Sequence, residues 1–124
     1  MSTKVSRYAV RRVGDAMAVV SFILNSEANR GARAAALRRA LRFHIHARVL
    51  GHRQLTPLGD DAWIWAELNS PSSTRALYAN PPDWHEMRLW SALLNPGDLF
   101  VDVGANIGLY TMWAAQCGAQ VLAV

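Results

Sequence analysis

The residues best suited to chemistry lie near the end of the sequence, where an acid is followed by a glycine-rich turn. Asp102 stands in an apolar stretch at residues 99–103, and the turn at residues 104–108 follows directly. An acid among apolar residues is costly unless a partner balances it, and a cationic ligand group such as an amine would do so. The free N–H groups at the start of a following helix suit a carboxylate or phosphate. The segment therefore predicts a ligand site.

The spacing of the glycines narrows the kind of ligand. Gly104 and Gly108 form a G-x-x-x-G pattern with Asn106 between them. The dinucleotide fingerprint G-x-G-x-x-G does not fit this pattern, and no lysine follows Gly108 as a phosphate-binding loop requires. Gly104 has no Cβ, so backbone can approach a ligand closely at that position. A nucleotide-dependent oxidoreductase is therefore disfavoured.

The elements around the turn are those of a strand–helix–strand crossover. Residues 99–103 are typical of a strand buried on both faces of a parallel sheet. Residues 109–117 have helical periodicity, Gly118 is a candidate helix cap, and residues 121–124 begin a second apolar strand. Open parallel sheets bind ligands at the carboxyl ends of their strands, which is where Asp102 and the turn fall.

The amino-acid sequence of this segment resembles that of a known family. The sequence D-V-G-A-N-I-G at residues 102–108 resembles motif I of class I methyltransferases. Residues 94–124 add an N-P-G-D lead-in, a tyrosine-threonine pair and the tail G-A-Q-V-L-A-V, and together they are similar to the FkbM family. The resemblance implies S-adenosyl-L-methionine as cofactor, with Asp102 toward its methionine amino end. It further implies that Gly104, Ala105 and Asn106 wrap the methionine portion and that Gly108 begins the helix.

The resemblance also sets expectations for fold and reaction. It implies an α/β chain with an incomplete class I methyltransferase (Rossmann-like) sheet, preceded by an α+β amino-terminal extension. The extension is expected at residues 1–73 and the start of the methyltransferase domain at residues 74–124. The implied reaction is O-methylation of a small molecule or sugar hydroxyl in the cytoplasm. We expect the family's ribose-binding acid past residue 124, so the chain is expected to be a fragment that is inactive alone, and no catalytic residue is assigned.

A basic helix offers a different function. Residues 32–50 read as a helix with an apolar stripe of Ala34, Leu37, Leu41 and Ile45, stopped by Gly51. Several arginines lie beside that stripe, and most of the basic residues fall in the first 50 positions. The alternatives are therefore a non-enzymatic binding protein that uses helix 32–50, or a methyltransferase that acts on a macromolecule. Nucleic acid is not expected to be the partner of this chain.

The other segments give a coarser picture. Residues 16–24 fit either a helix or a buried strand. Residues 54–68 predict a β-hairpin in which Trp63 and Trp65 pack into the core, with an aromatic ligand platform as the alternative. Residues 69–73 are expected to be a polar loop. A helix is predicted at residues 84–94, with Asp83 and Glu86 as a capping box and His85 solvated.

Composition excludes several classes of protein. The chain of 124 residues is 52% hydrophobic, which is too apolar for a disordered protein. The longest largely apolar run, residues 16–24, is too short to span a membrane. A single cysteine, Cys117, excludes an internal disulfide and is expected to be a small buried hydrophobe. No metal site is predicted, because His44 and His46 point to different faces of their helix.

Overall fold

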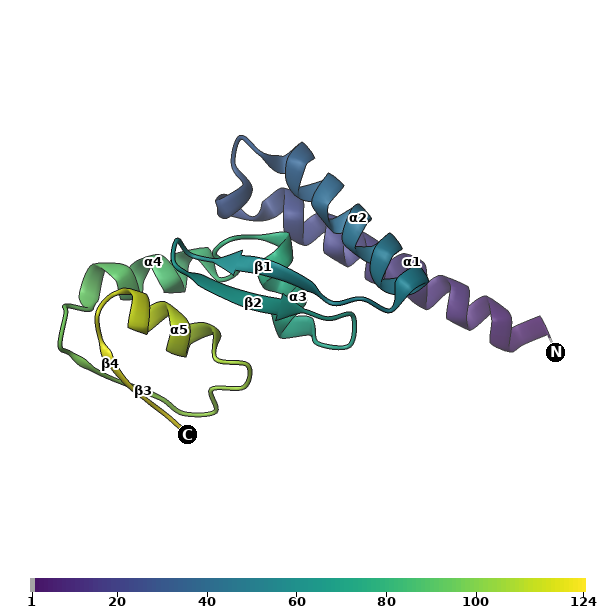
Figure 1. Cartoon of the computed structure of the whole chain (residues 1–124). Coiled ribbons are helices and arrows are strands. Elements are labelled where there is room, and N and C mark those ends of the chain that lie inside the picture. The colour runs from purple at the N-terminus through teal and green to yellow at the C-terminus, as the bar shows by residue number, and fades with distance from the viewer. Residues whose placement is uncertain (1) are drawn as a thin grey trace.

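The computed structural model describes residues 2–124, and it describes side chains from residue 14 onward. Within this range the chain is a mixed α/β structure of five α-helices, a short 3-10 helix and two two-stranded sheets (Figure 1). Their order is α1 (Ser2–Asn25), η1 (Glu27–Asn29), α2 (Arg33–Leu50), β1 (Gln54–Leu58), β2 (Ala62–Ala66), α3 (Pro71–Tyr78), α4 (Trp84–Leu93), β3 (Leu99–Asp102), α5 (Leu109–Gln116) and β4 (Gln120–Ala123).

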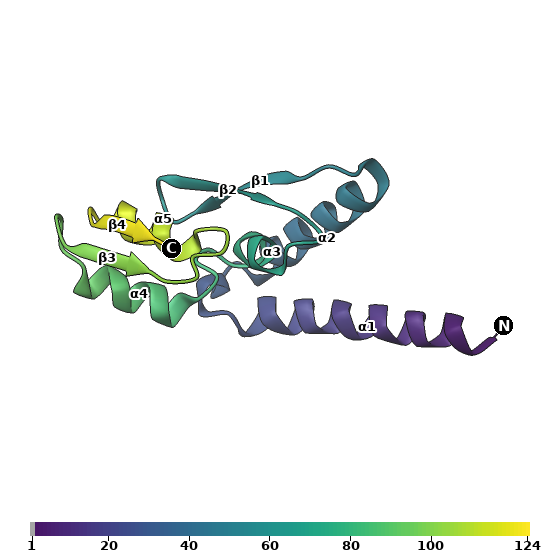
Figure 2. The same cartoon turned by 90° about the horizontal axis from the view of Figure 1, so that it is seen from below.

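The elements fall into two groups joined by the hairpin. Figures 1 and 2 show α1 and α2 at one end of the molecule and α4, β3, α5 and β4 at the other, with β1, β2 and α3 between them. Each end has its own cluster of buried side chains. Helix α3 contributes to both, because Leu77 belongs to the first cluster and Ala76 to the second. The expected domain boundary between residues 73 and 74 falls inside this helix.

Helix α2 turns an alanine-rich face inward. The stretch at residues 16–24, which fitted helix or strand, is part of helix α1. The residues of α2 buried against the first cluster are Ala36, Ala40, Phe43 and Ala47. The apolar stripe noted in the sequence does not face this cluster: Ala34, Leu41 and Ile45 are exposed, and only Leu37 packs against the cluster. Alanines at this spacing let neighbouring elements approach closely, and Phe43 is the one large side chain of α2 that is buried on this face.

The hairpin is formed as predicted, but its tryptophans face outward. Strands β1 and β2 pair antiparallel, with Thr56 opposite Ile64 and Leu55 opposite Trp65. Successive side chains of a strand point to opposite faces. Thr56 and Ile64 are buried, so Trp63 and Trp65 lie on the other face and are 58% and 47% exposed. The prediction that these tryptophans pack into the core is therefore wrong.

Helix α3 replaces the loop expected at residues 69–73. Ser70 occupies the N-cap position and Pro71 lies in the first turn. Backbone N–H groups of the first turn have no partner within the helix, so the N–H that proline lacks is not needed there. The hydroxyls of Ser73 and Thr74 donate to the Ser70 carbonyl oxygen at 2.9 and 3.3 Å. The helix ends at Tyr78, shortly before Pro81-Pro82, because a proline cannot continue a helix without losing a backbone hydrogen bond.

The second sheet is a parallel pair held against helices. Strands β3 and β4 run parallel, with Asp102 opposite Ala123. Phe100 packs edge-on against Trp90 of α4, with ring centroids 5.0 Å apart. Leu99 and Val101 are 69% and 49% exposed, so the prediction that this strand is buried on both faces is wrong for the described chain. The helices α4 and α5 cover one face of the pair and leave these alternate residues on the other.

Candidate functional site

The predicted ligand turn between β3 and α5 contains three residues in the left-handed backbone conformation. Gly104, Asn106 and Gly108 have φ values of 75°, 53° and 79°. Asn106 is the only residue other than glycine with positive φ in the described part of the chain, and asparagine tolerates that conformation better than most residues. The Gly104 N–H donates to the Val124 carbonyl oxygen at 2.7 Å, and the Gly108 N–H donates to Ala105 at 2.8 Å. These bonds fix the turn at the carboxyl end of β3.

A cavity of about 220 Å³ opens on this turn. We call it the turn cavity; its lining residues are Ser72, Arg75, Pro82, Asp83, Asp102, Gly104, Ala105, Asn106, Ile107, Leu109 and Tyr110. Four of the five predicted site residues are among them, whereas Gly108 occupies the N-cap position of α5 instead. Pockets for whole drug-sized ligands hold roughly 300–1,000 Å³. The turn cavity therefore suits a small ligand or one end of a larger one.

Asp102 is held in place by the helix that follows the turn. The Thr111 hydroxyl of α5 donates to Asp102 Oδ2 at 2.6 Å. In the described residues, the ion pairs join Arg30 to Glu27, Arg53 to Glu67 and Arg75 to Asp83, and none involves Asp102. The negative charge of Asp102 is thus oriented by a neutral hydroxyl and remains free to attract a cation.

The opposite wall of the turn cavity was not predicted from the sequence. Arg75 Nη2 of α3 lies 2.7 Å from Asp83 Oδ1, and the Tyr110 hydroxyl of α5 donates to Asp83 Oδ2 at 3.1 Å. The predicted capping box is wrong, because Asp83 makes no side-chain bond to its own helix, and Glu86 is exposed. Burial, followed by the charge of Asp83, raises the pKa of Tyr110 to about 12. Tyr110 therefore stays protonated and serves as a donor to Asp83.

The sequence held one signal that could have found this wall. The Ser70-Pro71 pair is a helix start, and a helix from Pro71 places Ser72 and Arg75 on one face because they are three residues apart. In the structure, the Asn106 side-chain amide donates to the Ser72 hydroxyl at 3.1 Å. This bond links α3 directly to the turn.

The open space above the turn is consistent with close approach of a ligand. A Cβ placed on Gly104 would meet no atom within 4 Å, so a small group can approach the backbone there. Asp102 and Asp83 bring two negative charges to the turn cavity, and Arg75 brings one positive charge already paired with Asp83. The turn cavity can accordingly hold a cationic amine beside Asp102 and an anionic group toward Arg75.

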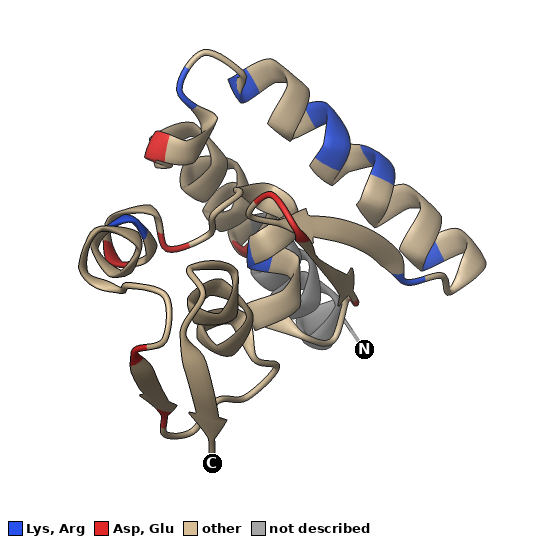
Figure 3. Cartoon of the chain, turned by 60° about the vertical axis from the view of Figure 1, so that its left-hand side comes forward, with Lys and Arg blue, Asp and Glu red and all other residues tan. Residues whose placement is uncertain are grey.

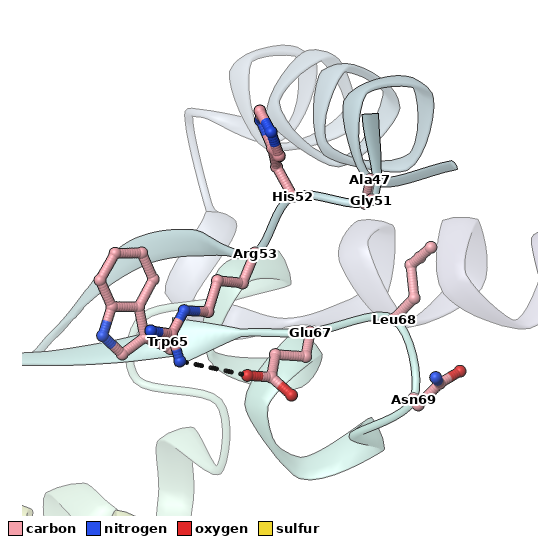
Figure 4. A pocket seen from close by; sticks show the side chains of 8 residues that line it. All are labelled: Ala47, Gly51, His52, Arg53, Trp65, Glu67, Leu68 and Asn69. Carbon is pink, nitrogen blue, oxygen red and sulfur yellow. Dashed lines mark ion pairs between the residues drawn. The ribbon is translucent and has the colours of Figure 1, made fainter. Parts of the chain in front are cut away.

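A larger cavity lies elsewhere, between the end of α2 and the hairpin. It measures about 730 Å³ and is lined by Ala47, Gly51, His52, Arg53, Trp65, Glu67, Leu68 and Asn69 (Figure 4). Its charged side chains face one another: the Arg53 guanidinium lies 4.4 Å from the centre of the Trp65 ring and 3.7 Å from Glu67. Because this pairing covers the aromatic ring, we prefer the smaller turn cavity as the candidate site despite the difference in volume.

The other residues considered from the sequence lie outside the turn cavity. The His44 ring Nε2 lies 2.7 Å from the Tyr78 hydroxyl, and burial, followed by the charge of Arg48, lowers the pKa of His44. Cys117 is partly exposed, not buried as expected, and His85 is exposed. Among the described residues, no three histidine, cysteine or acidic side chains lie close enough to hold a metal ion.

Comparison with known proteins adds no assignment. No protein-family model matches the sequence, and neither curated proteins nor solved structures gave a match. Within residues 2–124, none of the helices is both long enough and apolar enough to span a membrane.

Proposed function

We propose that the turn cavity binds the methionine end of S-adenosyl-L-methionine and that this chain is part of a methyltransferase of the FkbM type. The observation that carries the proposal is the grouping of Asp102, Gly104, Ala105 and Asn106 around one cavity at the carboxyl end of a parallel strand. Ligands of open α/β sheets bind at that end. The resemblance of residues 94–124 to the family supplies the identity of the cofactor.

Each residue has a role that follows from its chemistry. Asp102 would accept hydrogen bonds from the cofactor's ammonium group, with Thr111 fixing the carboxylate. Arg75 is the cation of the turn cavity and would attract the methionine carboxylate. Gly104 leaves room for the chain between those two groups. A volume of about 220 Å³ suits this amino-acid end and not the whole cofactor.

The reaction we propose is O-methylation of a small molecule or sugar in the cytoplasm. When bound, S-adenosyl-L-methionine would supply a methyl group on a positively charged sulfur. An acceptor oxygen would bond to the methyl carbon as the carbon–sulfur bond breaks, and S-adenosylhomocysteine would leave. The residues described here would orient the cofactor, and orientation of reactants is a large share of catalysis in such a displacement.

The proposal is tested by measuring binding of S-adenosyl-L-methionine with ligand-observed NMR, which detects weak complexes. A hydrogen bond to a charged group contributes about 1.5–3 kcal/mol, so Asp102→Asn should weaken binding about 10- to 100-fold. The replacement amide can still accept the bond from Thr111, which preserves the local fold. Asp61→Asn in the exposed hairpin turn is the matched control and should bind like the unchanged chain. Equal binding by both variants, or no saturable binding at all, would refute the proposal.

A further inference from the structure

The outer face of α2 carries large apolar side chains that the fold does not use. Leu41, Ile45 and Val49 are 61%, 51% and 74% exposed. They are four residues apart, so they form one continuous row, which we call the α2 stripe. The opposite face of the helix is buried mainly through alanine. Single exposed apolar residues are common on protein surfaces, but contiguous ones are not. The exposed row of leucine, isoleucine and valine therefore indicates a surface that a partner covers.

Arginines border the α2 stripe on one side. Arg38 and Arg42 each precede a stripe residue by three positions and therefore lie beside it. They also line a groove of about 530 Å³ together with Arg39, His46 and Arg53, which we call the arginine groove. Among the described residues, no aspartate or glutamate lines this groove. Figure 3 shows the same separation of charge, with basic positions following one another along α2 and acidic positions mostly on other elements.

The charges of Arg38 and Arg42 are not balanced within the fold. In the part of the chain that the structure describes, neither forms an ion pair with a carboxylate. Arg39 is different, since its Nε donates to the Leu77 carbonyl oxygen at 2.7 Å. Like charges gathered along one helix repel one another, and an anionic surface placed against them would relieve that repulsion.

We infer that the outer face of α2 docks on a membrane surface that contains anionic phospholipid. The α2 stripe would enter the boundary between headgroups and acyl chains, and Arg38 and Arg42 would bind lipid phosphates beside it. This combination of an apolar row and adjacent basic residues is characteristic of helices that lie in the membrane interface. The inference stands on α2 alone and is independent of the methyltransferase proposal.

Two other occupants fit the surface less well. Nucleic acid would be bound through phosphates and base edges, which gives no role to an exposed apolar row. A second copy packed stripe to stripe would bring its own arginines close to these, and like charges across an interface are repulsive. The anionic bilayer is the partner that uses both the α2 stripe and the arginines.

The experiment is flotation of the full chain with phosphatidylcholine vesicles that contain or lack phosphatidylglycerol. We expect binding only to the anionic vesicles, and we expect it to weaken as salt is raised. A basic residue near an anionic surface contributes a factor of about five, so Arg38→Gln with Arg42→Gln should weaken binding about 25-fold. Leu41→Ser with Ile45→Ser should weaken it at least about tenfold through lost apolar insertion.

Matched controls on α4 separate docking from loss of folding. Leu89 and Leu93 are 56% and 57% exposed, so Leu89→Ser with Leu93→Ser removes the same apolar content from another helix and should leave vesicle binding unchanged. Circular dichroism checks that each variant is folded. Equal binding to both vesicle types overturns the inference. The inference is also overturned if the chain binds single-stranded nucleic acid and the arginine variants abolish that binding while the serine variants leave it intact. It is overturned as well if the chain binds no vesicles but forms a dimer that the serine variants separate.

Discussion

Replacing Met87 by alanine tests whether α4 is packed into the second cluster as the structure shows. Met87 of α4 is completely buried and belongs to the cluster with Leu58, Ala76 and Leu109. Methionine-to-alanine changes in a core cost about 2–5 kcal/mol, through lost transfer free energy and a residual cavity. We expect about 3 kcal/mol. With a urea dependence of roughly 1–3 kcal/mol per molar, the unfolding midpoint should fall by roughly 1–3 M.

Leu89→Ala on the same helix is the control. Leu89 is 56% exposed, and alanine is the best helix former, so its replacement should change the free energy of unfolding by less than about 0.5 kcal/mol. Urea unfolding followed by tryptophan fluorescence measures both variants. The backbone carbonyl of Met87, which accepts a bond from the Trp113 ring N–H at 2.7 Å, is retained in the variant. Equal destabilisation by the two changes would show that the packing described for α4 is wrong.

Three further changes have defined outcomes. Tyr110→Phe should lower stability by about 1 kcal/mol through loss of its bond to Asp83. Because the folded pKa of Tyr110 is about 12 and its ordinary value is 10.0, its protonated form contributes stability that is complete below pH 10 and lost as the pH rises toward 12. Unfolding midpoints measured across that window should fall less steeply in this variant. Gly14→Ala, in open space within α1, should raise stability by about 0.5–1 kcal/mol in thermal unfolding. Gly118→Ala should lower it by about 1–2 kcal/mol, because φ is +85° and its Cβ would lie 3.1 Å from Pro96; no loss in calorimetry would contradict that geometry.

The local parts of the site could be predicted from the sequence. The turn and the following helix depend on residues close together in the chain, so the G-x-x-x-G pattern of Gly104 and Gly108 was sufficient to indicate them. The far wall depends on contacts between distant residues. Tyr110 and Asp83 are 27 positions apart, and no spacing rule connects them. Sequence reasoning therefore found one side of the turn cavity and missed the other.

The sequence could not determine which side of α2 is buried, and the reason is physical. Both an alanine row and a leucine-isoleucine row repeat at helical spacing, and periodicity alone cannot choose between them. An amphipathic helix ordinarily turns its more hydrophobic row toward the core, which here would be the row of Leu41 and Ile45. Close approach of neighbouring elements selected the row of Ala36 and Ala40 instead. Because the alanine row packs inward, the row of Leu41 and Ile45 is left exposed on the outer face of α2.

The central claim is that the turn cavity, and not the larger one beside the hairpin, binds S-adenosyl-L-methionine. Amide NMR spectra of the chain recorded during a titration with the cofactor test it most directly. We predict saturable shifts at Gly104, Ala105 and Asn106, and in Asp102→Asn these shifts should need about 10- to 100-fold more cofactor. Shifts confined to the large cavity at residues 51–53 and 65–69, or no saturable shift anywhere, would contradict the claim.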